Sequence, residues 1–162
     1  MLRLHMTKEG HEMTIKLLLA AALALGAQAA MAEDALPTLA DLEQNAELKA
    51  SFDKLTKDQD LPEWVLDGMS TSPTQKVSFD GKEYLAMSGC KPHDCGGNQF
   101  ALLYQPESHD AYGLLALGDP EKKQELTWLN IGGNAESIDG RTLLYAVTTG
   151  SIANHADSFA YK

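Results

Sequence analysis

The sequence predicts an α+β domain with a mostly antiparallel sheet of about five strands, flanked by helices. Beyond the N-terminal region, segments with helical periodicity come first, and a series of short β-type segments separated by turn residues follows them. An apolar segment near the C-terminus is bounded by residues that start and stop helices. Helices grouped before and after a run of strands are typical of α+β domains rather than of alternating α/β folds.

The first helix is predicted between Thr38 and Leu55, with about four turns. Thr38 and Asp41, three residues apart, resemble a capping box in which Asp replaces the usual Glu. The apolar residues that follow recur at the spacing of one helix face. They are Leu39, Leu42, Ala46, Phe52 and Leu55.

Two further helices are predicted from their start and stop signals. A shorter helix, within residues 60–68, has Pro62 in its first turn and Gly68 as its stop. Residues 143–148 are an apolar run that suits either a helix or a strand. Asp139 as a cap before this run and Gly150 after it favour a helix.

Five short segments between these helices have β-strand character. They are residues 76–79, 83–87, 100–104, 112–117 and 126–131. Asp80-Gly81, between the first two, is a strong signal for a two-residue hairpin turn. Gly132-Gly133 is expected to end the fifth strand. Trp64 and Trp128 are predicted to be core residues rather than platforms for a ligand.

Residues 1–32 have the parts of a secretory signal peptide. Lys16 precedes an uncharged apolar run, residues 17–26, and small residues then lead to Ala30-Met31-Ala32. The run is shorter than the stretch of about 20 apolar residues that a membrane anchor needs. A basic start, a short apolar core and an A-x-A site together predict export.

Cleavage is expected after Ala32, with Ala29 as the alternative site, and Met13 is an alternative start of the chain. The mature chain, residues 33–162, is then 130 residues long. That length suits a single domain with one hydrophobic core. We expect this domain in the periplasm of a bacterium with an outer membrane.

The charge balance is strongly acidic. The chain has 13 Lys and Arg against 23 Asp and Glu, for a net charge of −10. Loss of residues 1–32 removes three basic and two acidic residues, which makes the net charge −11. Such a chain repels nucleic acid and anionic lipid, so we expect neither as a partner. The acidity permits a basic protein partner, although it also simply keeps an exported protein soluble.

The two cysteines, Cys90 and Cys95, enclose Lys91-Pro92-His93-Asp94 between the second and third predicted strands. An even count of cysteines in an exported chain predicts a disulfide. Closing so short a loop adds only roughly 2 kcal/mol to global stability, so stiffening the enclosed residues is the better reason for the bond. A rigid loop with a polar tip lowers the ordering cost of binding and suits insertion into a polar cleft.

The segment Cys90-Lys-Pro-His-Asp-Cys95 resembles the signature loop of the Ivy family, the inhibitors of vertebrate lysozyme of Gram-negative bacteria. The signal peptide, the mature length and the ending around residues 150–157 also resemble this family. The resemblance implies a periplasmic inhibitor of c-type lysozyme that protects peptidoglycan. It implies that His93 enters the active-site cleft, with Lys91, Pro92 and Asp94 beside it, and that Cys90 and Cys95 clamp the loop.

The chemistry of such a plug is coherent. A retaining glycosidase holds two carboxyl groups about 5–5.5 Å apart. An imidazolium donates hydrogen bonds from both ring nitrogens, so one ring can bond both carboxyl groups. Charge-assisted bonds contribute roughly 1.5–3 kcal/mol each, so a wider surface must add to the affinity. An acidic body that faces a basic enzyme is a natural second contribution.

Other classes of function fit the sequence less well. The spacing C-x₂-H-x-C is not a usual zinc pattern, and redox enzymes of this kind use C-x-x-C. G-x-S-x-G and H-E-x-x-H patterns are absent, and His109 and His155 are expected in surface turns. We therefore predict no enzyme activity, metal or cofactor.

Two alternatives for the loop stay open. The chain could bind the cell's own periplasmic lytic transglycosylases, which also attack peptidoglycan and also present acidic groups in a sugar cleft. The disulfide could also be purely structural, although this leaves the histidine at the tip unexplained. The oligomeric state is open as well, and a homodimer is compatible with the sequence.

Overall fold

A computed structural model describes residues 35–132 and 136–159 of the chain. The chain divides into two units, Met1–Ala35 and Leu36–Lys162, and the helices and strands described here all lie in the second. The predicted signal peptide, residues 1–32, lies outside the described residues. In the part that is described, no helix has both the length and the apolar character to cross a membrane.

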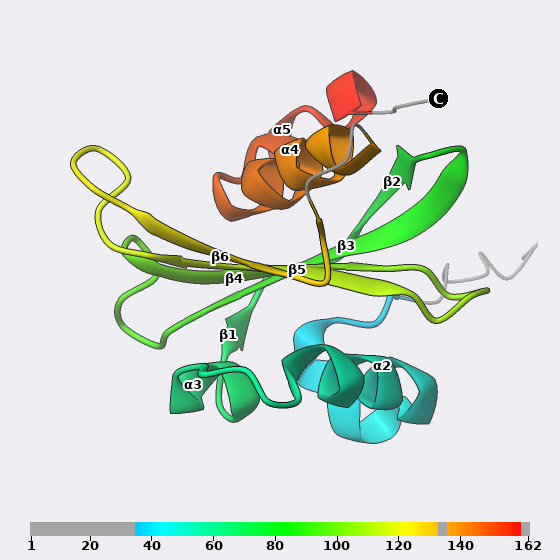
Figure 1. Ribbon diagram of the computed structural model, residues 1–162, viewed down its shortest axis with the longest axis horizontal. Coiled ribbons are helices and arrows are strands. Elements are labelled where there is room, and N and C mark those ends of the chain that lie inside the picture. Colours follow the sequence, from blue (N-terminus) through cyan, green and yellow to red (C-terminus); the bar gives the residue numbers. More distant parts are fainter. Residues whose placement is uncertain (1–34, 133–135, 160–162) are drawn as a thin grey trace, which may run out of the picture. The chain divides into compact units, whose positions relative to one another are not determined.

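The described residues form an α+β fold around one antiparallel sheet, which confirms the predicted fold class (Figure 1). Its strands within these ranges are β1 (Ser70–Thr71), β2 (Gln75–Phe79), β3 (Lys82–Cys90), β4 (Asn98–Tyr104), β5 (Ala111–Leu117) and β6 (Glu125–Leu129). Strands β3, β4, β5 and β6 are neighbours in that order. β1 and β2 both pair with β3.

The predicted hairpin is confirmed by the backbone of its turn. Asp80 and Gly81 have φ of 50° and 70°, as a type I′ turn requires at both central positions. β1 was missed because a strand of two residues leaves no alternation to detect. It pairs with the end of β3, Ser70 opposite Cys90, while β2 pairs with the earlier part of the same strand. β1 thereby places a backbone segment directly beside the disulfide.

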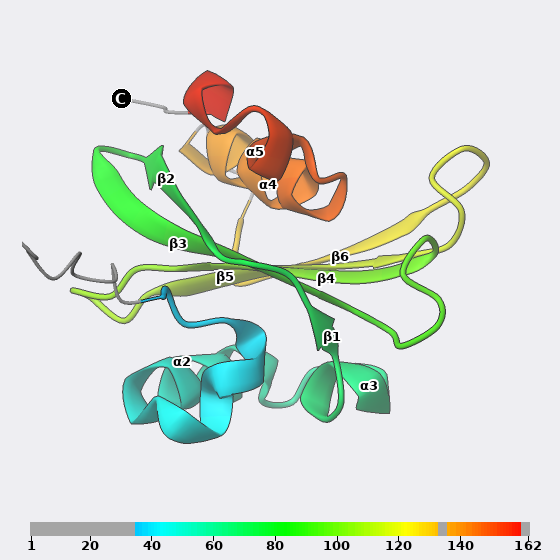
Figure 2. The ribbon, with the colours of Figure 1, turned by 180° about the vertical axis from the view of Figure 1, so that it is seen from behind.

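Helices cover both faces of the sheet (Figures 1 and 2). The 3₁₀ helix η1 (Leu39–Gln44) and the helices α2 (Ala46–Thr56) and α3 (Glu63–Leu66) pack on one face, and α4 (Glu136–Thr148), α5 (Ser151–Asn154) and η2 (Ala156–Phe159) pack on the other. Residues of β4 alternate between the two cores: Phe100 and Leu102 join the first, Ala101 and Leu103 the second. Burial on both faces explains why the central strands are continuous apolar runs.

The single helix predicted between Thr38 and Leu55 is wrong, because the chain breaks at Asn45. Asn45 caps the end of η1 and its side chain accepts a hydrogen bond from the backbone N–H of Leu48, 3.0 Å away, at the start of α2. Asparagine competes for backbone groups in this way and favours helix ends. The capping box is confirmed, since the carboxylate of Asp41 accepts from the backbone N–H of Thr38 at 2.8 Å.

The other element boundaries also needed correction. Pro62 occupies the N-cap position of α3 rather than its first turn. β6 ends at Leu129, two residues early, because Asn130 takes φ of 54°. The C-terminal helix is confirmed, but it begins at Glu136, so Asp139 lies inside it and is not its cap.

The two tryptophans pack as predicted against the cores. Trp64 is partly buried against the first core and Trp128 against the second. The guanidinium carbon of Arg141 lies 5.2 Å from the centre of the Trp128 ring, which is a cation–π contact.

Candidate functional site

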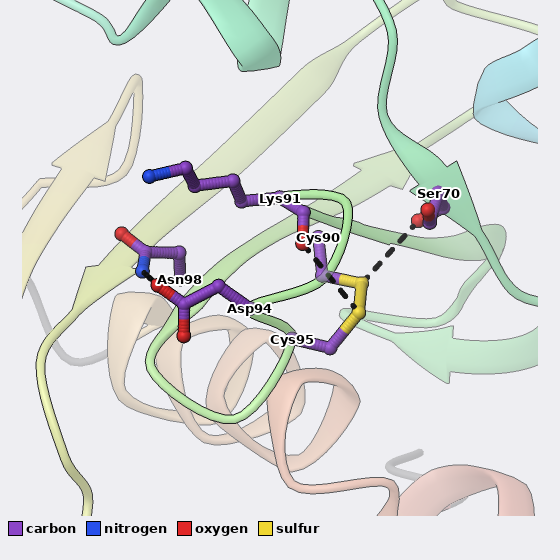
Figure 3. Close-up of a disulfide and its surroundings, with 6 residues drawn as sticks. All are labelled: Ser70, Cys90, Lys91, Asp94, Cys95 and Asn98. Carbon is purple, nitrogen blue, oxygen red and sulfur yellow. Dashed lines mark hydrogen bonds between the residues drawn. A yellow bond between two sulfur atoms is a disulfide. The ribbon is translucent and has the colours of Figure 1, made fainter.

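The segment from Cys90 to Cys95, called the ring below, connects β3 and β4 at one end of the sheet (Figure 3). Cys90 is the last residue of β3 and lies opposite Gln99 of β4. The Cys90–Cys95 disulfide is formed, with the two Cα atoms 4.9 Å apart, which confirms the predicted pairing. The ring therefore starts directly from the sheet rather than from a long loop.

The tip of the ring is a tight turn with His93 at its third position. The backbone N–H of Asp94 donates to the carbonyl of Lys91 at 3.0 Å. Pro92 at the second position and a positive φ at the third, 67° for His93, are features of a type II turn. Histidine is among the few non-glycine residues that are enriched at positive φ, so the tip has a local reason for its shape.

The predicted contact residues differ in exposure. Lys91, His93 and Asp94 are exposed, and Pro92 is half-buried. His93 forms no hydrogen bond or ion pair with any residue that the structure describes. Both imidazole nitrogens are therefore available to a partner.

The two disulfide sulfurs lie against backbone carbonyls. The sulfur of Cys90 is 3.6 Å from the oxygen of Ser70 in β1, and that of Cys95 is 3.7 Å from the oxygen of Lys91 (Figure 3). A disulfide sulfur carries no proton, so these are van der Waals contacts rather than donated hydrogen bonds. They seat the disulfide between the neighbouring strand and the first carbonyl of the turn.

The carboxylate of Asp94 is exposed but is held by a hydrogen bond from another side chain of the chain. Its Oδ2 accepts a hydrogen bond from the side-chain amide of Asn98, the first residue of β4, at 2.6 Å. In Figure 3 this pair lies on the side of the ring away from the disulfide. Sequence reasoning missed Asn98. An amide four residues after a ring carboxylate, beyond a Gly-Gly pair, was the signal available.

A second loop lies beside the ring. The N–H of Gly118, at the start of the β5–β6 connection, donates to the carbonyl of Gly97 at 2.7 Å. Gly118 has φ of 102°, and a Cβ there would stand 2.5 Å from the carbonyl oxygen of Lys123, so glycine is required. Hydrogen bonds from Lys122 and from the backbone of Glu121 lower the pKa of Asp119, which stays ionised in this loop.

A hollow of about 590 Å³ lies between the ring and this connection, and carboxylates stand on both sides of it. Its lining includes Asp94, Asn98, Asp119 and Glu121. Lys122 pairs with Asp119 at 2.9 Å, so the charge at this end is mixed. The disulfide also borders an apolar pocket of about 330 Å³, whose walls include Phe100, Val147 and Ile152.

Two other histidines, His109 and His155, lie in the part of the chain that the structure describes. His109 is in the β4–β5 turn at the other end of the sheet, where its Nδ1 lies 3.0 Å from the hydroxyl of Tyr104. His155 follows α5 and is exposed. Among the described residues there is no group of three or more metal-ligating side chains. The disulfide also leaves neither cysteine as a thiolate.

The fold and the site together define a binding protein that displays a preformed polar tip. A family model described as "Inhibitor of vertebrate lysozyme (Ivy)" matches residues 47–130, a range that contains the ring. The inhibitor of vertebrate lysozyme from Escherichia coli is 42% identical over 137 residues, covering 84% of this chain and 86% of that protein. The chain therefore belongs to the Ivy family, a family of inhibitors rather than enzymes.

Two further relatives match less of the chain. The inhibitor of vertebrate lysozyme from Pseudomonas aeruginosa is 35% identical over 80 residues, which are 48% of this chain and 52% of that protein. A protein from Yersinia pestis, described as uncharacterized, is 33% identical over 103 residues, which are 57% of this chain and 67% of that protein.

Proposed function

We propose that this chain is exported to the periplasm and inhibits c-type lysozyme by placing the tip of the ring in the enzyme's active-site cleft. The observation that carries the proposal is His93, which is exposed at the tip of a disulfide-closed turn and forms no hydrogen bond with a described residue. Membership of the Ivy family supports lysozyme as the target. Residues 1–32 support export, because they have the parts of a signal peptide.

The imidazole is suited to a site that contains two carboxyl groups. Protonated histidine donates from both nitrogens, and the two bonds can bridge carboxyl groups about 5–5.5 Å apart. In this position the imidazole of His93 takes the place of the sugar at the cleaved bond. We expect Lys91 and Asp94 to contact the walls of the cleft, while Pro92 stiffens the turn behind them.

The rest of the affinity must come from a wider surface. Two charge-assisted bonds contribute at most about 3–6 kcal/mol, whereas a micromolar complex needs about 8 kcal/mol. The net charge of the chain, −10, favours encounter with a basic enzyme. We therefore expect inhibition to weaken as salt is added, since added salt screens exposed charges.

The test is a titration of the purified, oxidised residues 33–162 into a c-type lysozyme that is digesting peptidoglycan. We expect stoichiometric loss of activity and competition with a short chitin oligosaccharide for the cleft. A lysozyme variant with its acid carboxyl group replaced by an amide should bind more weakly. No inhibition at micromolar excess would reject lysozyme as the target, and the same titration against a lytic transglycosylase would then test the other enzyme.

Export is tested separately, by expressing the full chain with a C-terminal tag in a Gram-negative host. We expect the tagged protein in the periplasmic fraction, with an N-terminus at Glu33. A protein that keeps residues 1–32 and stays with the cytoplasmic fraction would contradict this part of the proposal.

A further inference from the structure

Two separate constraints hold the ring, on opposite sides of it. The disulfide joins its ends, Cys90 and Cys95. The bond from the side-chain amide of Asn98 to the carboxylate of Asp94 holds the residue that directly follows His93. Figure 3 shows the two on either side of the turn. Sequence reasoning attributed the rigidity of the tip to the disulfide and to Pro92 alone.

Asn98 is firmly attached to the sheet. It is the first residue of β4 and lies opposite Leu117 of β5, and its carbonyl accepts from the N–H of Lys91 at 3.0 Å. The preceding residue, Gly97, is bonded through its carbonyl to Gly118. A side chain on so well-anchored a backbone provides a fixed point for the carboxylate of Asp94.

The turn needs such support, because a positive φ is unfavourable for a residue with a Cβ atom. The backbone N–H of Asp94 closes the turn around His93 by donating to Lys91. Fixing the Asp94 side chain therefore also fixes the bond that keeps His93 in place. The disulfide acts on the same turn from the other side.

We propose that Asn98 is a positioning residue for His93. Asn98 and the disulfide hold the tip independently of each other. The turn therefore keeps its shape when either constraint is lost and opens when both are lost. The shape of the turn is a property of the free protein, whereas the effect of Asn98 on inhibition rests on the proposed function.

A double-mutant cycle tests this proposal. It compares the wild type, Asn98→Ala, the pair Cys90→Ser/Cys95→Ser, and the combination of all three changes. Parallel constraints predict that Asn98→Ala and the cysteine pair each weaken lysozyme inhibition by less than about threefold, because the remaining constraint still holds the turn. The combination should then exceed the product of the two effects by at least about threefold. Effects that simply multiply would overturn the proposal.

A second measurement does not depend on any enzyme. Hydrogen exchange and ¹⁵N relaxation of the Asp94 amide report the closed turn in the free protein. We expect this amide to stay protected in the wild type and in the disulfide-free pair, and to lose its protection when Asn98→Ala is added to that pair. Equal protection with and without Asn98 in the disulfide-free protein would overturn the proposal.

An exchange of the two side chains separates positioning from a general role in the strand. In the disulfide-free pair, Asn98→Asp places two carboxylates against each other and should loosen the turn at least as much as Asn98→Ala does there. Asp94→Asn combined with Asn98→Asp restores one donor and one acceptor, so the Asp94→Asn position should regain its amide protection. Failure to regain it, with the strand intact, would count against a positioning bond.

Gln99→Ala is the matched control, because residue 99 is the next on β4 and alternation turns its side chain to the opposite face, where it lines the pocket beside the disulfide without a hydrogen bond to any described residue. It should leave the exchange of the Asp94 amide unchanged. If the wild type does not inhibit lysozyme, the proposed function fails and the exchange data still decide the role of Asn98. If the wild type inhibits and the exchange data show no effect of Asn98, only the positioning role fails.

Discussion

Two histidines in turns at opposite ends of the sheet share a backbone conformation but not a role. His93 in the ring has φ of 67° and His109 in the β4–β5 turn has φ of 59°. The imidazole of His109 is hydrogen-bonded to the hydroxyl of Tyr104 at 3.0 Å, and the backbone carbonyl of His109 accepts from the hydroxyl of Ser51 at 3.0 Å. His93 forms no hydrogen bond with a described residue.

The difference lies in which groups stabilise each turn. At the far end, His109 itself makes the contacts that hold the turn to α2 and β4. In the ring, those contacts are made by the residues around His93: the disulfide, the Lys91–Asp94 turn bond and the Asp94–Asn98 pair. The side chain of His93 is available to a partner because neighbouring residues make the contacts that hold its turn. This contrast can be tested residue by residue.

The largest expected effect separates the two histidines directly. His93→Asn should weaken lysozyme inhibition by at least about 100-fold, because two charge-assisted bonds of roughly 1.5–3 kcal/mol each are lost. Asparagine accepts a positive φ, so the turn should persist, whereas alanine would add backbone strain. His109→Asn should leave inhibition within about twofold of the wild type, since it keeps its φ and lies at the other end of the sheet.

Inhibition constants from peptidoglycan turnover and thermal unfolding of both variants provide the readout. Equal losses of inhibition for His93→Asn and His109→Asn would show that the ring has no special role. A folded His93→Asn protein with inhibition within about threefold of the wild type would reject the plug.

The next effect concerns two glycines that flank the ring end. Gly118→Ala puts a Cβ 2.5 Å from the carbonyl oxygen of Lys123, on a residue with φ of 102°. We expect a loss of about 1–3 kcal/mol in the free energy of unfolding. Gly96→Ala is the matched control, because a Cβ there meets nothing within 4 Å. Urea unfolding of both variants checks the difference, and a similar stability of the two would contradict the account of this loop.

The fold was largely predictable, because local signals agree with the final structure along most of the chain. Asp80-Gly81 and the apolar segments on either side were enough to place the hairpin of β2 and β3. The largest error falls where one residue acts on two elements at once. Asn45 ends η1 and starts α2, and periodicity alone cannot show that break.

The site was predictable in its center and not in its support. The ring and the exposure of its tip follow from six residues of unusual composition. The contribution of Asn98 and of the Gly97–Gly118 bond depends on how β3, β4 and β5 align, with Cys90 opposite Gln99 and Asn98 opposite Leu117. Such alignment is a property of the whole sheet, so no short motif contains it.

A smaller effect is expected from the far end. Tyr104→Phe removes the hydroxyl that is bonded to His109 and should lower the free energy of unfolding by about 0.5–1.5 kcal/mol, the usual net contribution of one such hydrogen bond. Inhibition should not change, because Tyr104 and the ring lie at opposite ends of β4. A loss of inhibition without a loss of stability would show that the two ends are coupled.

The smallest effect is a change of stability at alkaline pH, and it too comes from the far half of the sheet. Burial, with a contribution from neighbouring Tyr112, raises the pKa of Tyr84 to about 12, while an unfolded chain titrates near 10. Above pH 10 the unfolded state therefore binds fewer protons than the native state, so stability falls as the pH rises from 10 towards 12. At pH 10.5 the loss should be about 0.5–1 kcal/mol.

Chemical denaturation at pH 8 and pH 10.5, for the wild type and for Tyr84→Phe, measures this difference. The variant should lose most of the pH dependence that belongs to this residue, whatever its own stability at pH 8. The ring and the β5–β6 connection contain no tyrosine, so the shape of the tip should not follow this titration. The protection factor of the Asp94 amide, which corrects for base-catalysed exchange, should stay constant across this range. A protection factor that fell in step with the ionisation of Tyr84 would show that the two ends of the sheet are coupled.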